Sequence, residues 1–337
     1  MMQWDHTSSE ISTQVEGWQD AHQAVDAAVD DLKYLWRQGQ YDDVIFTGCG
    51  STHYLAMSAA SLFQQAVGIS CRAVPSSEIL LHPRQVYGRG KPLLVAISRS
   101  GATTETIQAA EKFKADFQSD VIVISCYADK PLNAFATLNL AAFAGQEISI
   151  AQTRSFSSML VMAEGLAQVI SNTFSPRQFS NTHNAQVAAL REQALKYADP
   201  EQFQRVFYLG SGALHGLACE AMLKMKEMSL TSAEAFHPME FRHGPKSMID
   251  EQTLIVGLLD AHTYNAEIAV LNEMRALGAA VVTLSPDTHT DIRLEGHQQR
   301  PSIVHYMPFL QWLAYQRAVN KGLNPDAPRH LDQVVIL

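Results

Sequence analysis

The 337-residue chain lacks the features that mark several common protein classes. Its four cysteines form no C-x-x-C pair, so we expect neither a zinc knuckle nor a disulfide scaffold. Lysine and arginine number 25 against 34 aspartate and glutamate residues, and the net charge of −9 argues against a nucleic-acid-binding surface. No apolar run approaches the length of a membrane span, and the N-terminus has no signal-peptide pattern. These absences predict a soluble cytoplasmic protein that binds neither nucleic acid nor a membrane.

Nucleotide-binding signals are also weak in this sequence. It contains no G-x-x-x-x-G-K-[ST] loop, which disfavours nucleotide hydrolysis at a P-loop. Residues 48–52 read GCGST, a G-x-G without the third glycine or the later acidic residue of the dinucleotide-binding motif. A small phosphorylated metabolite is therefore a better candidate ligand than a nucleotide.

The sequence contains an internal repeat. Residues 44–47 (VIFT) form an apolar, strand-length run that ends in GCGST, and residues 206–209 (VFYL) form a similar run that ends in GSG. A helix-forming stretch follows each run, and Gly48 lies 50 positions before Ser98, as Gly210 does before Asp260. Further apolar runs follow in both copies, at residues 92–97 and 121–124 in the first and 254–259 and 280–284 in the second. Two halves of the chain therefore share one plan.

The repeat predicts the fold class. Fully apolar strands that alternate with helices indicate a parallel sheet covered on both faces. We therefore predict an α/β fold with two similar doubly wound parallel-sheet domains in tandem, each gathering ligands at the carboxyl ends of its strands. The polar segment 172–184 is the best boundary between the halves. The predicted parts are an N-terminal helical appendage (1–34), a first domain (35–172), a linker and helix (173–194), a second domain (195–325) and a C-terminal tail (326–337).

The turn at residues 98–105 (SRSGATTE) is the best candidate for a phosphate site. It follows a buried strand and opens a helix, where backbone N–H groups and the helix dipole favour an anion. Ser98, Ser100 and Thr103 supply hydroxyls, and Gly101 lets the backbone approach a ligand closely. The alternative is an ordinary helix cap with spare serines. We favour the anion site, because three hydroxyls and a glycine exceed what a cap requires.

The corresponding turn of the second half, at residues 260–265, should not bind phosphate. It lacks glycine and places Asp260 where a phosphate needs a donor. We therefore expect a phosphate site in the first half only.

Residues 220–245 form a second candidate site. Glu220, Lys224 and Glu227 stand at i, i+4 and i+7 of a helix-forming stretch, so one helical face carries two carboxylates with an ammonium between them. His243 follows within the sequence EFRHGP. The alternatives are a solvated, salt-bridged helix face and, for His243, a structural histidine that caps a turn.

Seven motifs, in order, carry a resemblance to a known family. They are GCGST (48–52), SRSGATTET (98–106), AGQEISIAQTR (144–154), GSG (210–212), EAMLKMKE (220–227), EFRHGP (240–245) and PRHL (328–331). In this order they closely resemble the double sugar-isomerase (SIS) domain proteins, and among these the isomerase half of glucosamine-6-phosphate synthase. The resemblance extends from about residue 40 to the C-terminus, and it implies a flavodoxin-like SIS fold for each half.

The resemblance implies which residues bind the substrate. In that family the serine-rich turn holds the sugar phosphate, which implies contacts from Ser98, Arg99, Ser100 and Thr103. The first glycine turn and the segment after AGQEI line the sugar pocket, which implies contacts from Gly50, Ser51, Thr52, Ile150 and Gln152. The C-terminal tail closes the site, which implies contacts from Arg329 and Gln333.

The resemblance also implies the catalytic residues. The family's base, which carries a proton between C1 and C2 of the open-chain sugar, falls on Glu227, and Lys224 lies near the same site. The residue that assists ring opening falls on His243, which in relatives comes from the neighbouring subunit, so a homodimer with a shared active site is expected. The chemistry is reasonable, because one carboxylate can remove and return the proton and histidine titrates near neutral pH.

Two departures from the synthases affect the expected reaction. The synthases carry a glutaminase domain before this region, and here the SIS-like region starts almost at once. They also carry a lysine four residues after the arginine of the tail motif, where this chain has Gln333. That lysine can form an imine with fructose 6-phosphate, so its replacement argues against covalent capture of a ketose.

The leading hypothesis is therefore a deaminase that converts glucosamine 6-phosphate and water to fructose 6-phosphate and ammonia. The alternatives are a galactosamine-6-phosphate deaminase/isomerase, a fructosamine-6-phosphate deglycase or another phosphosugar aldose–ketose isomerase. A hypothesis of a different class is a non-catalytic sugar-phosphate sensor, against which the retention of Glu227 and His243 argues. No metal and no organic cofactor are expected for this chemistry.

Overall fold

The computed structural model describes residues 5–287, 289–294 and 302–335 of the chain. These residues divide into two compact units, each built around one sheet. The first-sheet unit comprises Thr13–Glu147, Gln152–Ser180 and Asp332–Leu337. The second-sheet unit comprises Met1–Ser12, Ile148–Ala151 and Asn181–Leu331. Both units are therefore assembled from segments that are distant in the sequence.

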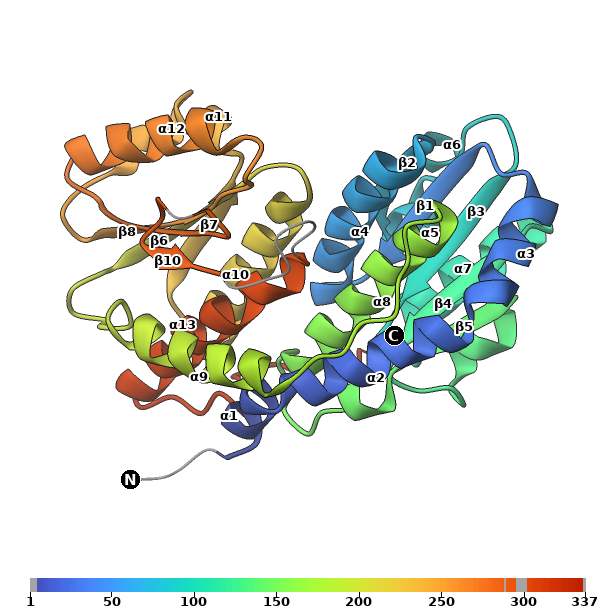
Figure 1. The fold of residues 1–337 in the computed structure, drawn as a ribbon, viewed down its shortest axis with the longest axis horizontal. Helices are drawn as coiled ribbons and strands as arrows, with labels where there is room; N and C mark the ends of the chain where they lie inside the picture. Colours follow the sequence, from blue (N-terminus) through green and yellow to red (C-terminus); the bar gives the residue numbers. More distant parts are fainter. Residues whose placement is uncertain (1–4, 288, 295–301, 336–337) are drawn as a thin grey trace. The chain divides into compact units, whose positions relative to one another are not determined.

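The first-sheet unit alternates strands with helices (Figure 1). Its elements are α2 (Gln14–Ala27), α3 (Val29–Gly39), β1 (Asp43–Gly48), α4 (Ser51–Val67), β2 (Ser70–Pro75), α5 (Ser76–Leu81), α6 (Pro83–Val86), β3 (Pro92–Ile97), α7 (Thr104–Phe117), β4 (Val121–Ser125), η1 (Pro131–Phe135), β5 (Leu138–Ala141), η2 (Phe143–Gly145) and α8 (Arg154–Ile170).

The second-sheet unit follows a similar sequence of elements. They are α1 (Asp5–Ser12), α9 (Asn181–Leu195), β6 (Arg205–Gly210), α10 (Ala213–Ser229), β7 (Ser232–Phe236), α11 (Pro238–Phe241), η3 (Pro245–Met248), β8 (Thr253–Leu258), α12 (Tyr264–Ala276), β9 (Ala280–Ser285), β10 (Ile292–Arg293), η4 (Ile303–Tyr306) and α13 (Met307–Asn320).

The two sheets have the same topology. The first has the order β2-β1-β3-β4-β5, and the second, read in the matching direction, has the order β7-β6-β8-β9-β10. Every strand pair recorded in both sheets is parallel. The chain therefore has two doubly wound parallel-sheet domains in tandem, which confirms the predicted fold class.

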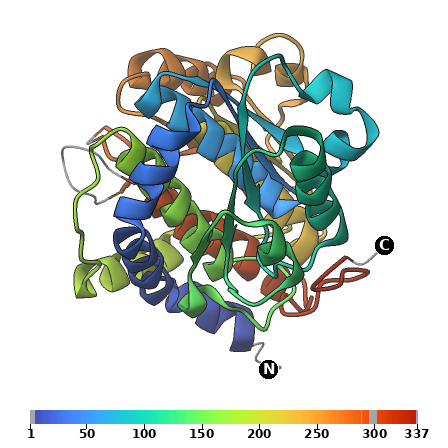
Figure 2. The same cartoon turned by 90° about the vertical axis from the view of Figure 1, so that its right-hand side faces the viewer.

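Apolar strands and helix faces build a core in each unit. The central strands β3 and β8 are buried along their whole length, as expected for strands covered on both faces. In the first-sheet unit Ala109 and Phe113 of α7 pack with Ile45 of β1 and Leu94 of β3. In Figure 2 the blue and cyan strands of this unit run between helices that cover them. In the described parts of the chain, no helix combines the length and apolar character needed to cross a membrane.

The same glycine turn opens the first long helix of each unit. Gly50 precedes α4 with φ 56° and ψ −124°, and Gly212 precedes α10 with φ 53° and ψ −130°. Side chains rarely adopt this backbone region, so the turn requires glycine in both copies. The turn directs both helices from the carboxyl end of their strand, where ligands bind in doubly wound sheets.

Candidate functional site

In the first-sheet unit, the predicted phosphate turn lies between β3 and α7. Ser98 is 2% exposed, and its Oγ lies 3.4 Å from Thr103 Oγ1 and accepts a hydrogen bond from Gly101 N at 3.1 Å. Ser100 Oγ accepts one from Ala102 N at 3.2 Å. Gly101 has φ +61°, and a Cβ at this position would lie 2.7 Å from Lys130 Cβ. The turn is thus a tight loop with hydroxyls gathered at the start of a helix.

The capping alternative receives no support at this turn. Thr103 occupies the N-cap position of α7, and its side chain makes no capping hydrogen bond. The amide of Thr104 instead lies 3.5 Å from the carbonyl oxygen of Val335, a long contact that holds weakly. The hydroxyls are therefore not consumed in capping, and the N-terminus of a 14-residue helix favours an anion.

Arg99 of the predicted phosphate turn makes contacts within the protein. Its guanidinium lies 3.6 Å from the carboxylate of Glu147, whose side chain is fully buried, and donates to the carbonyl oxygen of Gln333 at 2.7 Å. Gln333 in turn donates from Nε2 to the carbonyl oxygen of Glu147 at 3.1 Å. Two predicted site residues, Arg99 and Gln333, are thus brought together, and Arg99 fastens the C-terminal tail beside the phosphate turn.

Sequence reasoning missed Glu147, although it is the acidic residue of the quoted AGQEI motif. Its carboxylate accepts hydrogen bonds from Thr153 N at 2.7 Å, from Thr153 Oγ1 at 2.6 Å and from the hydroxyl of Ser155. A carboxylate with this many donors fixes the start of α8. The signal available in the sequence was a lone acidic residue among small and apolar ones.

The glycine turn before α4 holds Ser51 and Thr52, which are 5% and 3% exposed. The hydroxyl of Thr52 lies 2.9 Å from both the amide and the carbonyl oxygen of Cys49, so it closes its own turn. The parallel register pairs Thr47 of β1 with Ala96 of β3, which places this turn and the phosphate turn at the same sheet edge. Gly50 at the tip has open space where a Cβ would stand.

Two predicted pocket residues, Ile150 and Gln152, lie in the segment that follows Glu147. Ile150 belongs to the second-sheet unit, is half-buried, and donates its amide to the carbonyl oxygen of Asp326 at 3.1 Å. Gln152 belongs to the first-sheet unit, and its Oε1 is a buried oxygen without a hydrogen-bond partner among the described residues. An unpaired buried amide oxygen is costly, which makes Gln152 a suitable group to accept from a ligand.

The charged face of α10 is buried. The side chains of Glu220 and Lys224 are 0% and 1% exposed, which excludes the alternative of a solvated helix surface. Lys224 Nζ lies 3.3 Å from Glu220 Oε1 and makes a short ion pair with Glu227. Glu227 is 18% exposed, so it is the one residue of these three whose side chain solvent reaches to a substantial extent.

Lys224 stays protonated in this row. Burial alone would lower the pKa of its ammonium, but the Glu220 and Glu227 carboxylates outweigh burial and raise the pKa above the ordinary 10.5. The Glu227 carboxylate therefore lies beside a fixed positive charge. Such a carboxylate can accept a proton from a substrate and return it.

The remaining predicted residues of the second-sheet unit are exposed. His243 follows α11, and Gly244 after it has φ +143°. The imidazole of His243 and the guanidinium of Arg329 make no hydrogen bond or ion pair with the described residues. Both side chains are therefore available to a ligand or to another molecule.

Two cysteines lie near the predicted site residues, and burial shifts the pKa of both thiols. Burial raises the pKa of Cys219 on α10 to about 11, and it also raises the pKa of Cys49 in the glycine turn, so both thiols stay protonated near neutral pH. Among the described residues, no group of three or more His, Cys, Asp and Glu side chains is arranged to hold a metal ion.

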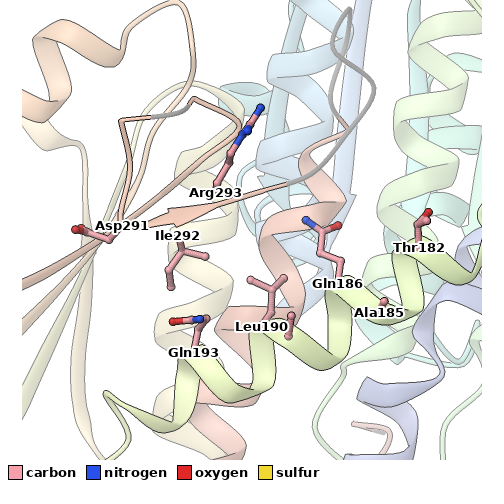
Figure 3. Close-up of a pocket in the computed structure, with 9 residues that line it drawn as sticks. Thr182, Ala185, Gln186, Leu190, Gln193, Asp291, Ile292 and Arg293 are labelled. Carbon is pink, nitrogen blue, oxygen red and sulfur yellow. The ribbon is translucent and has the colours of Figure 1, made fainter.

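A pocket of about 410 Å³ lies between α9 and β10, away from all the predicted site residues. In Figure 3 Ile292 of β10 points toward Leu190 of α9, and Gln186 and Gln193 stand on the same helix. The lining mixes apolar with polar and charged side chains, and none of the predicted site residues belongs to it. We assign this pocket no ligand.

The fold and these residues define a tandem doubly wound α/β protein with a hydroxyl-lined turn at a helix N-terminus in one unit and a buried carboxylate–lysine–carboxylate row in the other. The chain belongs to the SIS domain family, which matches residues 40–168 and 201–297. This confirms the family that the sequence motifs indicated.

Known members resemble the chain over most of its length. The glutamine–fructose-6-phosphate aminotransferase (isomerizing) of Pyrococcus horikoshii is 28% identical over 315 residues, which cover 88% of this chain and 52% of that protein. A putative D-galactosamine-6-phosphate deaminase of Escherichia coli is 27% identical over 322 residues, which cover 85% of this chain and 80% of that protein. The chain thus spans about half the length of the aminotransferases that it matches.

A solved structure gives a comparison at similar identity. The glucosamine-6-phosphate deaminase of Thermotoga maritima is 27% identical, with a TM-score of 0.77, and the match covers 94% of this chain and 100% of that one.

Proposed function

We propose that this protein is an amino-sugar phosphate deaminase that converts glucosamine 6-phosphate and water to fructose 6-phosphate and ammonia. The buried row on α10 carries the proposal. Glu220 and Lys224 are shielded from solvent, while Glu227 is 18% exposed beside the Lys224 cation. A partly exposed carboxylate held by a buried cation suits a base that moves a proton between neighbouring carbons.

The proposed binding step uses the turn between β3 and α7. The sugar phosphate accepts hydrogen bonds from the hydroxyls of Ser98, Ser100 and Thr103 and from the amides that open α7. Phosphate at a helix N-terminus is stabilised by the dipole and by these donors. Arg99 supplies positive charge nearby while its guanidinium holds the tail at Gln333.

The proposed chemical steps balance without a further reactant. His243 moves the proton that opens the ring, between O1 and O5, and Glu227 then takes the C2 proton and delivers it to C1. In this transfer the C2 amine loses one N–H proton and becomes an imine, while the aldehyde oxygen at C1 gains one proton and becomes a hydroxyl. Water adds to that imine carbon and ammonia leaves, so that a C=O bond replaces the C=N bond.

Two observations favour deamination over aminotransfer for this chain. Gln333 stands where the synthases that the chain resembles have an imine-forming lysine, and an amide cannot form a Schiff base. The match to the Thermotoga maritima deaminase also covers 94% of this chain and 100% of that one. The Escherichia coli relative makes the galacto substrate the second candidate.

Ammonia release from a panel of substrates tests the proposal. The panel holds glucosamine 6-phosphate, galactosamine 6-phosphate and a fructosamine 6-phosphate, with fructose 6-phosphate and glucose 6-phosphate as probes of isomerisation alone. We expect ammonia from glucosamine 6-phosphate in stoichiometric yield with fructose 6-phosphate. Isomerisation without ammonia would replace the deaminase by an isomerase, and binding without turnover would indicate a sensor.

We further propose a homodimer in which His243 serves the substrate of the partner subunit. Its exposed ring, without a partner among the described residues, is available for this role. Mixing subunits that carry Glu227→Gln with subunits that carry His243→Ala should restore about a quarter of the activity, because half of a random dimer mixture is mixed and each mixed dimer has one intact site. Absence of any restoration, or an active monomer in sedimentation, would rule the shared site out.

A further inference from the structure

Helix α1 lies outside the residues that match the SIS family, yet it carries buried polar side chains. Glu10 is 4% exposed and Thr7 is 0% exposed. A carboxylate is placed in such a position only where donors compensate for the loss of water. Glu10 is therefore expected to accept hydrogen bonds from buried donors.

Glu10 binds the segment that contains the predicted pocket residue Ile150. Its Oε1 accepts hydrogen bonds from Ile148 N at 2.6 Å and from Ser149 N at 3.2 Å. The hydroxyl of Ser149, which is 1% exposed, donates to Oε2. Three donors from two consecutive residues meet one carboxylate, and this arrangement fixes the local backbone.

A second link from α1 holds the other side of the same segment. Thr7 donates its amide and its hydroxyl to Asp326 Oδ1 at 2.8 and 2.6 Å. The carbonyl oxygen of Asp326 in turn accepts the amide of Ile150 at 3.1 Å. Residues 148–150 are thus tied to α1 directly through Glu10 and indirectly through Asp326, and all these groups belong to the second-sheet unit.

We propose that Glu10 is a positioning residue for the sugar pocket. It does not touch the substrate, and it acts by fixing residues 148–150 so that Ile150 presents one conformation to the sugar. The proposal rests on the proposed function, in which Ile150 lines that pocket. It makes the N-terminal helix a working part of the binding site.

Three variants of the full chain test the role. Glu10→Gln keeps the shape of the side chain but leaves one acceptor oxygen and no charge for three donors. Glu10→Ala removes all the contacts. Glu16→Gln is the matched control, because Glu16 lies on the neighbouring helix α2 and is exposed.

The expected readout is a change in KM. Glu10→Gln should raise KM for the amino-sugar phosphate about tenfold with a smaller effect on kcat, and Glu10→Ala should raise it further, because a mobile pocket segment weakens binding. Inhibition by inorganic phosphate should be unchanged, since phosphate uses the turn of the first-sheet unit. Glu16→Gln should behave as the wild type.

Unchanged KM in a folded Glu10→Gln protein, even with a lowered Tm, would show a merely structural residue and overturn the proposal. Glu10→Gln decides the matter if the alanine variant does not fold. A wild type without any turnover would refute the proposed function instead. In that case hydrogen exchange decides: the amides of Ile148 and Ser149 should exchange faster in Glu10→Gln than in Glu16→Gln, and equal exchange would contradict the role.

Discussion

The two sheet units differ in charge on a helix that has the same length and the same glycine turn in both. Helices α4 and α10 both have 17 residues, and they begin 162 positions apart, at Ser51 and Ala213. On α10 the buried row consists of Glu220, Lys224 and Glu227. The residues at the matching positions of α4 are, in the same order, Ser58, Leu62 and Gln65. The charge row is thus confined to one copy of a shared helix.

The turns that follow the central strands β3 and β8 also differ, and here the first-sheet unit has the candidate ligand-binding groups. The turn at residues 98–103 offers three hydroxyls and Gly101 at the start of α7. The matching turn before α12 has Asp260, whose Oδ1 accepts the amide of His262 at 2.7 Å. Close by, Glu267 of α12 is 3% exposed and accepts from the hydroxyl of Ser211. Carboxylates at and beside this turn would repel a phosphate.

The two copies of a duplicated fold can thus carry different functional groups at matching positions. One unit has a hydroxyl-lined turn that we propose binds the sugar phosphate, and the other has charges on the helix that we propose carries the catalytic base. Neither unit has both features at matching positions among the described residues. Substitutions that exchange features between matching positions therefore test the division directly.

The largest effect is expected on α10. Glu227→Gln removes the base and should lower kcat on the order of 10²–10⁴-fold while leaving inorganic phosphate binding intact, since general-base catalysis contributes in that range. The control is Gln65→Glu, which places a carboxylate at the matching, exposed position of α4. Steady-state kinetics should show wild-type rates for the control. A normal rate in Glu227→Gln would remove Glu227 from the mechanism.

The next effect concerns the stability of the buried row. Lys224→Met leaves the Glu220 carboxylate buried without its cation and should lower the free energy of unfolding by about 3–5 kcal/mol. Leu62→Met at the matching position of α4 should cost less than about 1.5 kcal/mol, because it conserves volume. Urea denaturation near pH 7 compares the two. Equal losses of unfolding free energy in Lys224→Met and Leu62→Met would mean that the buried row does not contribute specifically to the stability of the second-sheet unit.

The difference in stability between the wild type and Lys224→Met should depend on pH, with a sign set by the pKa of Lys224. The pKa of Lys224 is raised above 10.5 in the folded state, so the stability that its charge contributes is fully present below that pH. It is lost as the pH rises through the higher folded pKa. The difference in stability between the wild type and Lys224→Met should therefore stay constant up to about pH 10 and shrink above it. A difference that grows in alkali would contradict the assignment.

A smaller effect is expected at the phosphate turn. Ser100→Ala removes a hydroxyl donor to a dianion, worth roughly 1.5 kcal/mol, and should raise KM about tenfold without a change in Tm. His262→Ala, at the matching and exposed position of the second turn, is the control. Inhibition by inorganic phosphate should weaken in Ser100→Ala only. If both variants bind phosphate equally well, the anion site is not at this turn.

The smallest effect concerns a feature that both units share. Burial lowers the pKa of His53 on α4 and of His215 at the matching position of α10, against a backbone hydrogen bond that raises it in each case. The neutral rings then stabilise the fold above pH 6.5, and this contribution is lost as the pH falls through the lowered folded values. NMR titration should place both rings below 6.5. A pKa above 6.5 for either ring would contradict the expected similarity between the two units.

The sequence was sufficient for the fold because its signals are local. Apolar runs of strand length, the glycine turns and the equal spacings from Gly48 to Ser98 and from Gly210 to Asp260 each depend on neighbouring residues. Such signals repeat in both halves and so reinforce each other. The structure confirms the tandem parallel sheets that they predicted.

Burial of charge could not be predicted in the same way. The spacing of Glu220, Lys224 and Glu227 is the same on a solvated face and on a buried one, and only packing against the rest of the unit decides between them. Glu147 and Glu10 were missed for a related reason. The amide of Ile148, which donates to Glu10, is 138 positions away, and the cation beside Glu147 is the distant Arg99, so only the folded chain brings these groups together.

Arg99 illustrates the limit of a motif. The resemblance assigned it to the phosphate, and the folded chain shows its guanidinium between the Glu147 carboxylate and the Gln333 carbonyl. Its contact with phosphate stays a prediction. The ion pair joins Arg99 to a residue 48 positions downstream, and the hydrogen bond to Gln333 spans 234 positions, so no local pattern reports either contact.

Transfer of the C2 hydrogen to C1 tests the central claim most directly. The protein is incubated in ordinary water with glucosamine 6-phosphate deuterated at C2, and deuterium at C1 of the product is measured by NMR for the wild type, Glu227→Gln and Gln65→Glu. We predict deuterium at C1 together with ammonia release in the wild type and in Gln65→Glu, and neither in Glu227→Gln. Transfer that persists in Glu227→Gln, or that is absent from the wild type, would contradict the account.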